Sequence, residues 1–145
     1  VDPQKIERGE GRMEALREQP DDRTEEHGEN RRHVPDDEIY QNTRRFVLSR
    51  ENPFYYEGTA MKGVGSPHTP PRYVWHIALS MQGLTSQDWK EQEELLAMLE
   101  RTDAGTGYMH EGVFVDDPAQ FTRPWFAWSN SIFSEFVLHY LGMDK

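Results

Sequence analysis

The chain has 145 residues, carries 26 acidic against 16 basic side chains and contains no cysteine. Its net charge of −10 argues against nucleic acid as the main ligand, because phosphate binding needs a basic surface. The lack of cysteine excludes disulfide scaffolds, thiol catalysis and cysteine-ligated zinc, and no apolar run approaches the ~20 residues that a membrane helix requires.

Residues 1–35 differ in composition from the rest of the chain. All 17 aromatic residues lie at or after Tyr40, and residues 1–38 hold 13 acidic against 7 basic side chains. A segment so charged and so poor in large apolar groups buries too little surface to offset the entropy lost on ordering. We therefore expect residues 1–35 to be disordered, with a marginal helix over 3–18 as the alternative. An interaction role for this acidic segment stays open.

Apolar residues recur at helical spacing in four later stretches, which lie at about 36–49, 72–84, 86–102 and 124–141. Asp36 or Asp37 can cap the first of these helices. Thr85 with Asp88 resembles a capping box for the third, and Pro124 suits the first turn of the last.

The segments between these helices are predicted as loops. Residues 53–71 form a long loop rich in glycine and proline, and loops of this length in compact domains are often functional. Residues 108–122 are expected to be loop or short extended structure. The pattern predicts an all-α fold with its functional residues on the loops. On the third helix, four acids are expected to be solvated, namely Glu91, Glu93, Glu94 and Glu100.

The run at 106–128 places one carboxylate, Glu111, before a cluster of aromatic residues and an arginine. Aromatic faces beside carboxylates are what a sugar-binding cleft needs. On this interpretation Glu111 is a general base that takes a proton from water as the water attacks a sugar carbon. The alternative is a glutamate that caps a loop or joins it by a salt bridge.

Three further residues could bind a sugar. His68, in a Gly-Ser-Pro-His-Thr-Pro loop, could donate to a hydroxyl or could instead bond to the backbone. Arg123 could orient a carboxylate or hydroxyl, or could stack on Trp125 or Trp128. For at least one of these two tryptophans the alternative to ligand binding is packing in the core.

The remaining polar motifs do not indicate a metal or a phosphate site. The chain has His110-Glu111-Gly112 but no His-Glu-x-x-His, and the glycine loop at 62–66 lacks the spacing of a phosphate-binding loop. Asp116 and Asp117 could bind a hydroxyl or an ion, or could form an Asx-type turn. His76 is expected to be a histidine at the edge of the core. We expect no metal and no cofactor.

Several long motifs resemble the bacterial members of glycoside hydrolase family 125. Among them are Thr-Gly-Tyr-Met-His-Glu and Phe-Thr-Arg-Pro-Trp-Phe-Ala-Trp, and the matching stretches lie in order at 40–58, 63–70, 75–86, 102–111 and 121–131. The resemblance implies an (α/α)6 barrel and an inverting, metal-independent exo-α-1,6-mannosidase acting on mannose-containing glycans. It implies that Glu111 is the general base, with His68, Arg123 and Trp125 around the sugar.

The resemblance also implies that the chain is one part of a larger domain. Family members are typically about three times as long, and their general acid, an aspartate, lies in the earlier part. Residues 36–145 would therefore be the C-terminal portion of the barrel, inactive until the N-terminal half is supplied. The alternative is a non-catalytic carbohydrate-binding or vestigial helical module. No signal-peptide pattern opens the chain, and we expect a cytoplasmic protein. The acidic charge and the lack of a long apolar run predict no nucleic-acid and no membrane partner.

Overall fold

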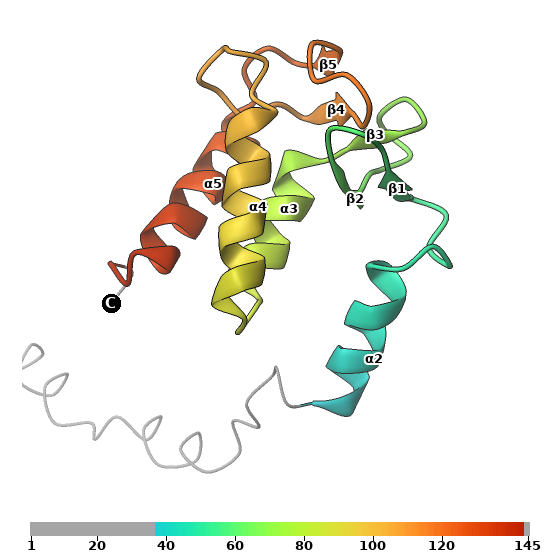
Figure 1. The fold of residues 1–145 in the computed structure, drawn as a ribbon, viewed down its shortest axis with the longest axis vertical. Coiled ribbons are helices and arrows are strands. Elements are labelled where there is room, and N and C mark those ends of the chain that lie inside the picture. Colours follow the sequence, from blue (N-terminus) through green and yellow to red (C-terminus); the bar gives the residue numbers. More distant parts are fainter. Residues whose placement is uncertain (1–36, 144–145) are drawn as a thin grey trace, which may run out of the picture. The chain divides into compact units, whose positions relative to one another are not determined.

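The computed structural model describes residues 37–143, so the expectations for residues 1–35 lie outside the described range. Figure 1 shows the order of the elements. They are α2 (Glu38–Val47), β1 (Tyr55–Glu57), β2 (Lys62–Val64), β3 (Tyr73–Val74), α3 (His76–Leu84), α4 (Trp89–Arg101), β4 (Gly112–Phe114), β5 (Phe121–Thr122) and α5 (Ala127–Tyr140). The four expected helices are all present, in the expected order.

Five short strands show that the all-α expectation was incomplete. β1 and β2 form an antiparallel hairpin inside the stretch expected to be a loop. β3, β4 and β5 form a second antiparallel sheet, in which Tyr73 pairs with Phe114 and Gly112 pairs with Thr122. Strands of two or three residues are too short to show the alternation that identifies a strand in sequence.

The first residues of the helices agree with the prediction for α2 but not for α4 and α5. Asp37 caps α2 as expected, since its side chain accepts from the backbone N–H of Ile39 at 2.8 Å. The predicted capping box at Thr85 was wrong: Asp88 caps α4 through Lys90, and the Thr85 hydroxyl bonds back into α3. The last helix begins after Pro124, at Ala127.

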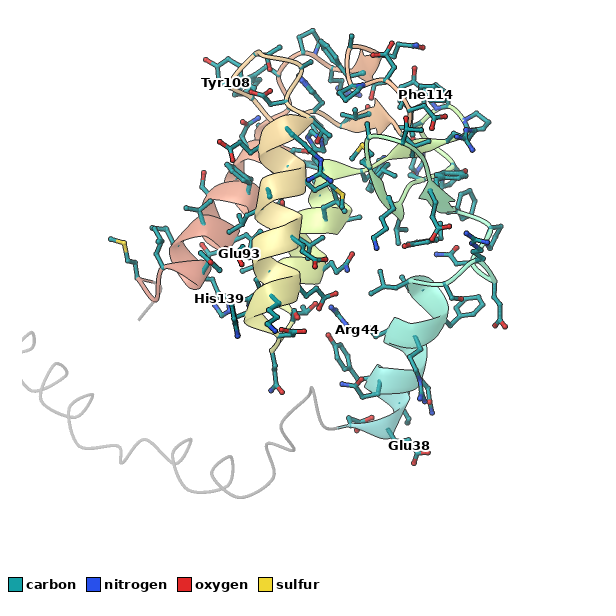
Figure 2. The ribbon with its side chains drawn as sticks, in the orientation of Figure 1. Glu38, Arg44, Glu93, Tyr108, Phe114 and His139 are labelled. Atoms are coloured by element: carbon teal, nitrogen blue, oxygen red, sulfur yellow. The ribbon has the colours of Figure 1, made fainter. Side chains whose placement is uncertain are left out.

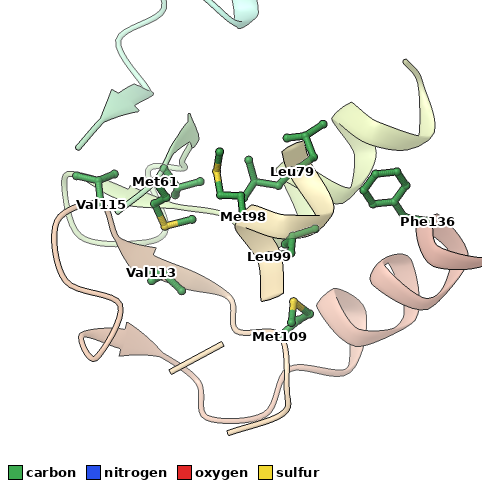
Figure 3. Packing of buried hydrophobic residues seen from close by; sticks show 10 residues of the cluster. Met61, Leu79, Met98, Leu99, Met109, Val113, Val115 and Phe136 are labelled. Carbon is green, nitrogen blue, oxygen red and sulfur yellow. The ribbon is translucent and has the colours of Figure 1, made fainter. Parts of the chain in front are cut away.

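The core lies where α3, α4 and α5 pack together and meet the second sheet. The three helices lie side by side, with the sheet at the end where α3 and α5 begin and α4 ends (Figure 1). Figure 3 shows that helical and strand residues share this core. Its buried members are Met61, Val74, Leu79, Leu95, Met98, Leu99, Met109, Val113, Val115 and Phe136. This arrangement puts the segment leading into β4 directly against the ends of three helices.

α2 buries none of its own residues and is attached through a polar network. Arg44 projects from α2 towards α3 and α4 (Figure 2), and its Nη2 donates to both carboxylate oxygens of Glu91 at 2.9 and 2.7 Å. The side chains of Gln82 and Ser86 also donate to Glu91. The expectation that Glu91 is solvated was therefore wrong, whereas Glu93, on the same helix, is exposed.

Candidate functional site

The hairpin formed by β4 and β5 places Glu111 opposite Arg123. Glu111 immediately precedes β4, and its backbone N–H donates to the carbonyl of Thr122 at 3.3 Å. The next amide, of Gly112, donates to the Thr122 hydroxyl at 3.0 Å. Because the two strands are held in this register, residue 123 follows at the position facing Glu111.

The side chains of Glu111 and Arg123 form an ion pair. Nε of Arg123 donates to Oε2 of Glu111 at 2.9 Å, and only 16% of the Glu111 side chain is exposed against 62% for Arg123. The carboxylate is thus recessed beneath a guanidinium that faces solvent. The alternative interpretation of Glu111 as a residue that joins a loop by a salt bridge describes this contact. A general-base role is compatible with it, because the arginine engages one oxygen.

The ring of Phe126 packs against the Arg123 guanidinium. The guanidinium carbon lies 5.3 Å from the ring centre of Phe126, so Arg123 stacks on this ring and not on Trp125 or Trp128, the alternative that the sequence left open. Both tryptophans are exposed, and the expectation that at least one packs in the core was therefore wrong. Phe126 and Trp128 contact each other with ring centres 5.6 Å apart.

His68 is exposed on the loop after β2, where its ring stacks on Trp75 with centres 6.4 Å apart. Its backbone N–H donates to the Ser66 hydroxyl at 3.1 Å. The following residue, Thr69, packs beside the site: a Cβ added to Gly112 would lie 3.0 Å from its Cγ2. The structure thus brings Glu111 and Arg123 into direct contact and packs the His68 loop against the residue next to Glu111.

Ser129 and Asn130, which the sequence did not single out, hold the segment before Glu111. The side chain of Asn130 accepts from the backbone N–H of Met109 and donates to its carbonyl, both at 3.1 Å. Ser129 donates to the carbonyl of His110 at 2.7 Å. Ser129 and Asn130 lie in the Trp-Ser-Asn-Ser stretch of the matching motif at 121–131, which was the available signal.

His76 is fully buried rather than at the edge of the core. Burial, reinforced by nearby His110 and opposed by Asp103, lowers the pKa of His76 to about 3, so its ring is neutral. Nδ1 accepts from the backbone N–H of His110 at 3.0 Å, which leaves the proton on Nε2 to donate to the Thr102 hydroxyl at 3.1 Å. Its hydrogen bonds therefore connect α3 and the end of α4 to the segment before Glu111.

Asp116 and Asp117, after β4, both accept hydrogen bonds from backbone amides. Oδ1 of Asp117 accepts from the amide of Ala119 at 3.0 Å, which confirms the Asx-type turn. Asp116 accepts from the amide of Thr59 at 2.9 Å and pairs with Arg72, so it links two loops. Within residues 37–143 no three histidine or acidic side chains converge as a metal site would require. No helix in that range is long and apolar enough to cross a membrane.

A family pattern, a curated relative and a solved structure all match this chain, each over about three quarters of its length. The sequence pattern of the family described as metal-independent alpha-mannosidase (GH125) matches residues 31–138. The meiotically up-regulated gene 157 protein of Schizosaccharomyces pombe is 48% identical over 107 residues, 73% of this chain and 21% of that protein.

A solved structure gives the same result. It is that of a metal-independent alpha mannosidase from Streptococcus pneumoniae, in a non-productive complex with alpha-1,6-mannobiose. It matches with a TM-score of 0.74 and 53% identity, over 75% of this chain and 26% of that one. The chain thus spans between a fifth and about a quarter of the length of these relatives.

Proposed function

Because the chain belongs to the GH125 family of metal-independent alpha-mannosidases, we propose that it is the C-terminal part of a glycosidase that removes terminal α-1,6-linked mannose from glycans. Support for the linkage comes from the Streptococcus pneumoniae relative, which was solved with alpha-1,6-mannobiose. In the complete enzyme these helices would form part of an (α/α)6 barrel.

The recessed Glu111–Arg123 ion pair is the observation that carries the proposal. A general base must be ionised before reaction, and the guanidinium compensates that charge while it occupies only Oε2. Oε1 then takes the proton from a water molecule that attacks the anomeric carbon. In an inverting glycosidase the acid stands across the sugar, about 6.5–9.5 Å from the base, and protonates the leaving oxygen as the glycosidic bond breaks. We place that acid outside this chain, so the chain alone is inactive.

His68, Arg123 and Trp125 contribute to sugar binding in this proposal. The exposed ring of Trp125 offers an apolar face against which a pyranose can stack, and His68 can donate to a hydroxyl. Arg123 has further N–H groups beyond the one bound to Glu111, and these can reach a hydroxyl on the same sugar.

A chimera tests the role of Glu111. Residues 36–143 would replace the matching part of the Streptococcus pneumoniae enzyme, and release of mannose from α-1,6-mannobiose would be measured. We expect the chimera to be active, and Glu111→Gln to lower kcat on the order of 10²–10⁴-fold with substrate binding retained. Near-normal turnover by the Gln variant would show that Glu111 is not the base. Mannose release by the purified 145-residue chain would contradict its inactivity alone.

Two exposed tryptophans favour a second candidate, a carbohydrate-binding module without catalysis. Trp125, just before α5, and Trp128, in its first turn, are both exposed to solvent. Calorimetry of the 145-residue chain with mannobiose separates the candidates when it is combined with the chimera assay. Binding by the chain together with an inactive chimera supports the module, whereas an active chimera supports the enzyme.

A further inference from the structure

His110 joins four segments of the chain through four different atoms. Its backbone N–H donates to Nδ1 of His76 at 3.0 Å, and its carbonyl accepts from Oγ of Ser129 at 2.7 Å. Its ring nitrogens Nδ1 and Nε2 lie 3.1 Å from the carbonyl oxygen of Arg123 and 3.0 Å from that of Asp103. These partners lie at the start of α3, at the start of α5, after β5 and after α4.

The His110 side chain is fully buried and stacks on Phe121, with ring centres 3.9 Å apart and planes 13° from parallel. It therefore cannot touch a substrate in this arrangement. The residue that follows is Glu111, so the contacts that fix the backbone of His110 also fix the start of the next residue. On the neutral ring, a proton on Nδ1 donates to the carbonyl of Arg123, whereas a proton on Nε2 donates to that of Asp103.

The backbone of Arg123 gives an independent reason for such a contact. Its φ is 52°, in the left-handed region that a residue with a Cβ rarely adopts. Strained backbone of this kind persists only where surrounding contacts over-determine it. The carbonyl oxygen of Arg123 lies 3.1 Å from Nδ1 of His110, and its Nε donates to Glu111. Both the backbone and the side chain of the strained residue therefore have a partner.

We propose that His110 is the positioning residue of the Glu111–Arg123 pair. It fixes the carboxylate through the adjacent peptide and fixes the arginine through the hydrogen bond that its Nδ1–H donates to the Arg123 carbonyl. Any catalytic consequence rests on the proposed function of Glu111 as the base. The contacts that position the pair do not depend on that function, so they can be tested without an activity.

The test uses the 15N-labelled 145-residue chain and the solvent exchange of the Arg123 Nε–H, measured by NMR. We expect His110→Gln to accelerate this exchange about tenfold, since the loss of one buried hydrogen bond releases the backbone of Arg123. Phe136→Leu is the control, because it loosens the core without touching the site. Under conditions where the two variants have the same free energy of unfolding, Phe136→Leu should leave the exchange of the Arg123 Nε–H at the wild-type rate. Equal exchange in wild type and His110→Gln, or equal acceleration by Phe136→Leu, would overturn the proposal.

A measurement on the wild type keeps the test decisive if His110→Gln does not fold. The Nδ1–H of His110 should exchange slowly and show nuclear Overhauser contacts to residue 123. A ring N–H in rapid exchange with water, or a proton found only on Nε2 and facing residue 103, would overturn the proposal. In the active chimera, His110→Gln should lower kcat about tenfold with KM unchanged within twofold, since it displaces the base without removing a substrate contact. A failure of Glu111→Gln to lower kcat would count against the base and not against the positioning contacts.

Discussion

Gly83 on α3 and Phe136 on α5 approach so closely that a Cβ on the glycine would lie 2.0 Å from Cζ of the ring. Phe136 is fully buried in the core cluster, so its ring can move only by displacing its neighbours. The absence of a side chain at position 83 is therefore what lets these two helices pack together.

We expect Gly83→Ala to destabilise the fold by about 2 kcal/mol or more. Alanine in place of glycine in a helix contributes up to about 1 kcal/mol of stability, but overpacking a close core contact costs roughly 1–3 kcal/mol or more. Here the overlap is with a rigid ring, so we expect the packing cost to dominate. Chemical denaturation of the two proteins measures the difference.

Phe136→Leu provides the matched partner for that substitution. Removing the ring vacates the space that the new methyl group needs, so the double variant should be less destabilised than the sum of the two single variants. Strict additivity between Gly83→Ala and Phe136→Leu would show that this contact does not limit the approach of α3 and α5.

His76 should make the stability of the chain depend on pH. Its folded pKa is about 3, below the ordinary value of 6.5, because burial disfavours the charged ring. Between these values the unfolded chain binds a proton that the folded chain does not. Stability is therefore complete above about pH 6.5 and falls as the pH decreases towards 3, by about 1 kcal/mol per pH unit.

His76→Asn should reduce that slope, since it removes the titrating ring and keeps an acceptor near the position of Nδ1. Denaturation at pH 7, 6 and 5 gives the slope directly. Leu79→Ala, on the same helix, lowers stability without removing a titratable group and should retain the wild-type slope. An unchanged slope in His76→Asn would assign the pH dependence to other groups.

The ion pair between Arg44 and Glu91 should couple α2 to α4. Partial burial alone would raise the pKa of Glu91, but hydrogen bonds from Ser86 and Gln82 and the charge and hydrogen bond of Arg44 outweigh it and hold the pKa below its ordinary value. A double-mutant cycle with Arg44→Met and Glu91→Gln should give a coupling of about 1 kcal/mol at pH 7. This coupling should disappear as the pH falls below about 4.5 through the lowered pKa, because only the ionised carboxylate pairs with arginine.

Arg50 and Glu57 supply the matched control for that cycle. Their side chains are 85% and 40% exposed, against 18% and 29% for Arg44 and Glu91. Solvent screens the exposed pair, so its coupling should stay below about 0.5 kcal/mol. Equal couplings for the two pairs would show that partial burial does not strengthen the contact of α2 with α4.

The helices were predictable from apolar residues at helical spacing, as the buried Leu95 and Leu99 on α4 illustrate. Strands of two or three residues carry no period, so the sequence indicated only that 108–122 could hold short extended structure, where β4 and β5 lie, and it missed β1 and β2. The contact of Glu111 with Arg123 was also hidden, because it depends on the register that pairs Gly112 with Thr122. Sequence motifs identified both residues of the pair, but only the folded hairpin brings them together.

Gly112→Ala tests how the His68 loop is placed beside Glu111. The added Cβ would lie 3.0 Å from Cγ2 of Thr69 and 3.4 Å from Oγ1 of Thr122, which is tight enough to push one neighbour by a few tenths of an ångström. In the chimera we expect this substitution to lower kcat/KM about tenfold with a stability loss of about 1 kcal/mol, because a small displacement near reacting groups costs more in rate than in folding.

Thr69→Ser distinguishes a displaced loop from a damaged strand. Serine lacks the Cγ2 that the new methyl group would meet and keeps the hydroxyl, which bonds to the carbonyl of Ser66 at 3.2 Å. If the loop is what moves, Thr69→Ser should restore most of the kcat/KM lost by Gly112→Ala, with little effect of its own. If kcat/KM stays low in the double variant, the strain falls on Thr122 and the β4–β5 pairing, and the His68 loop does not set the geometry around Glu111.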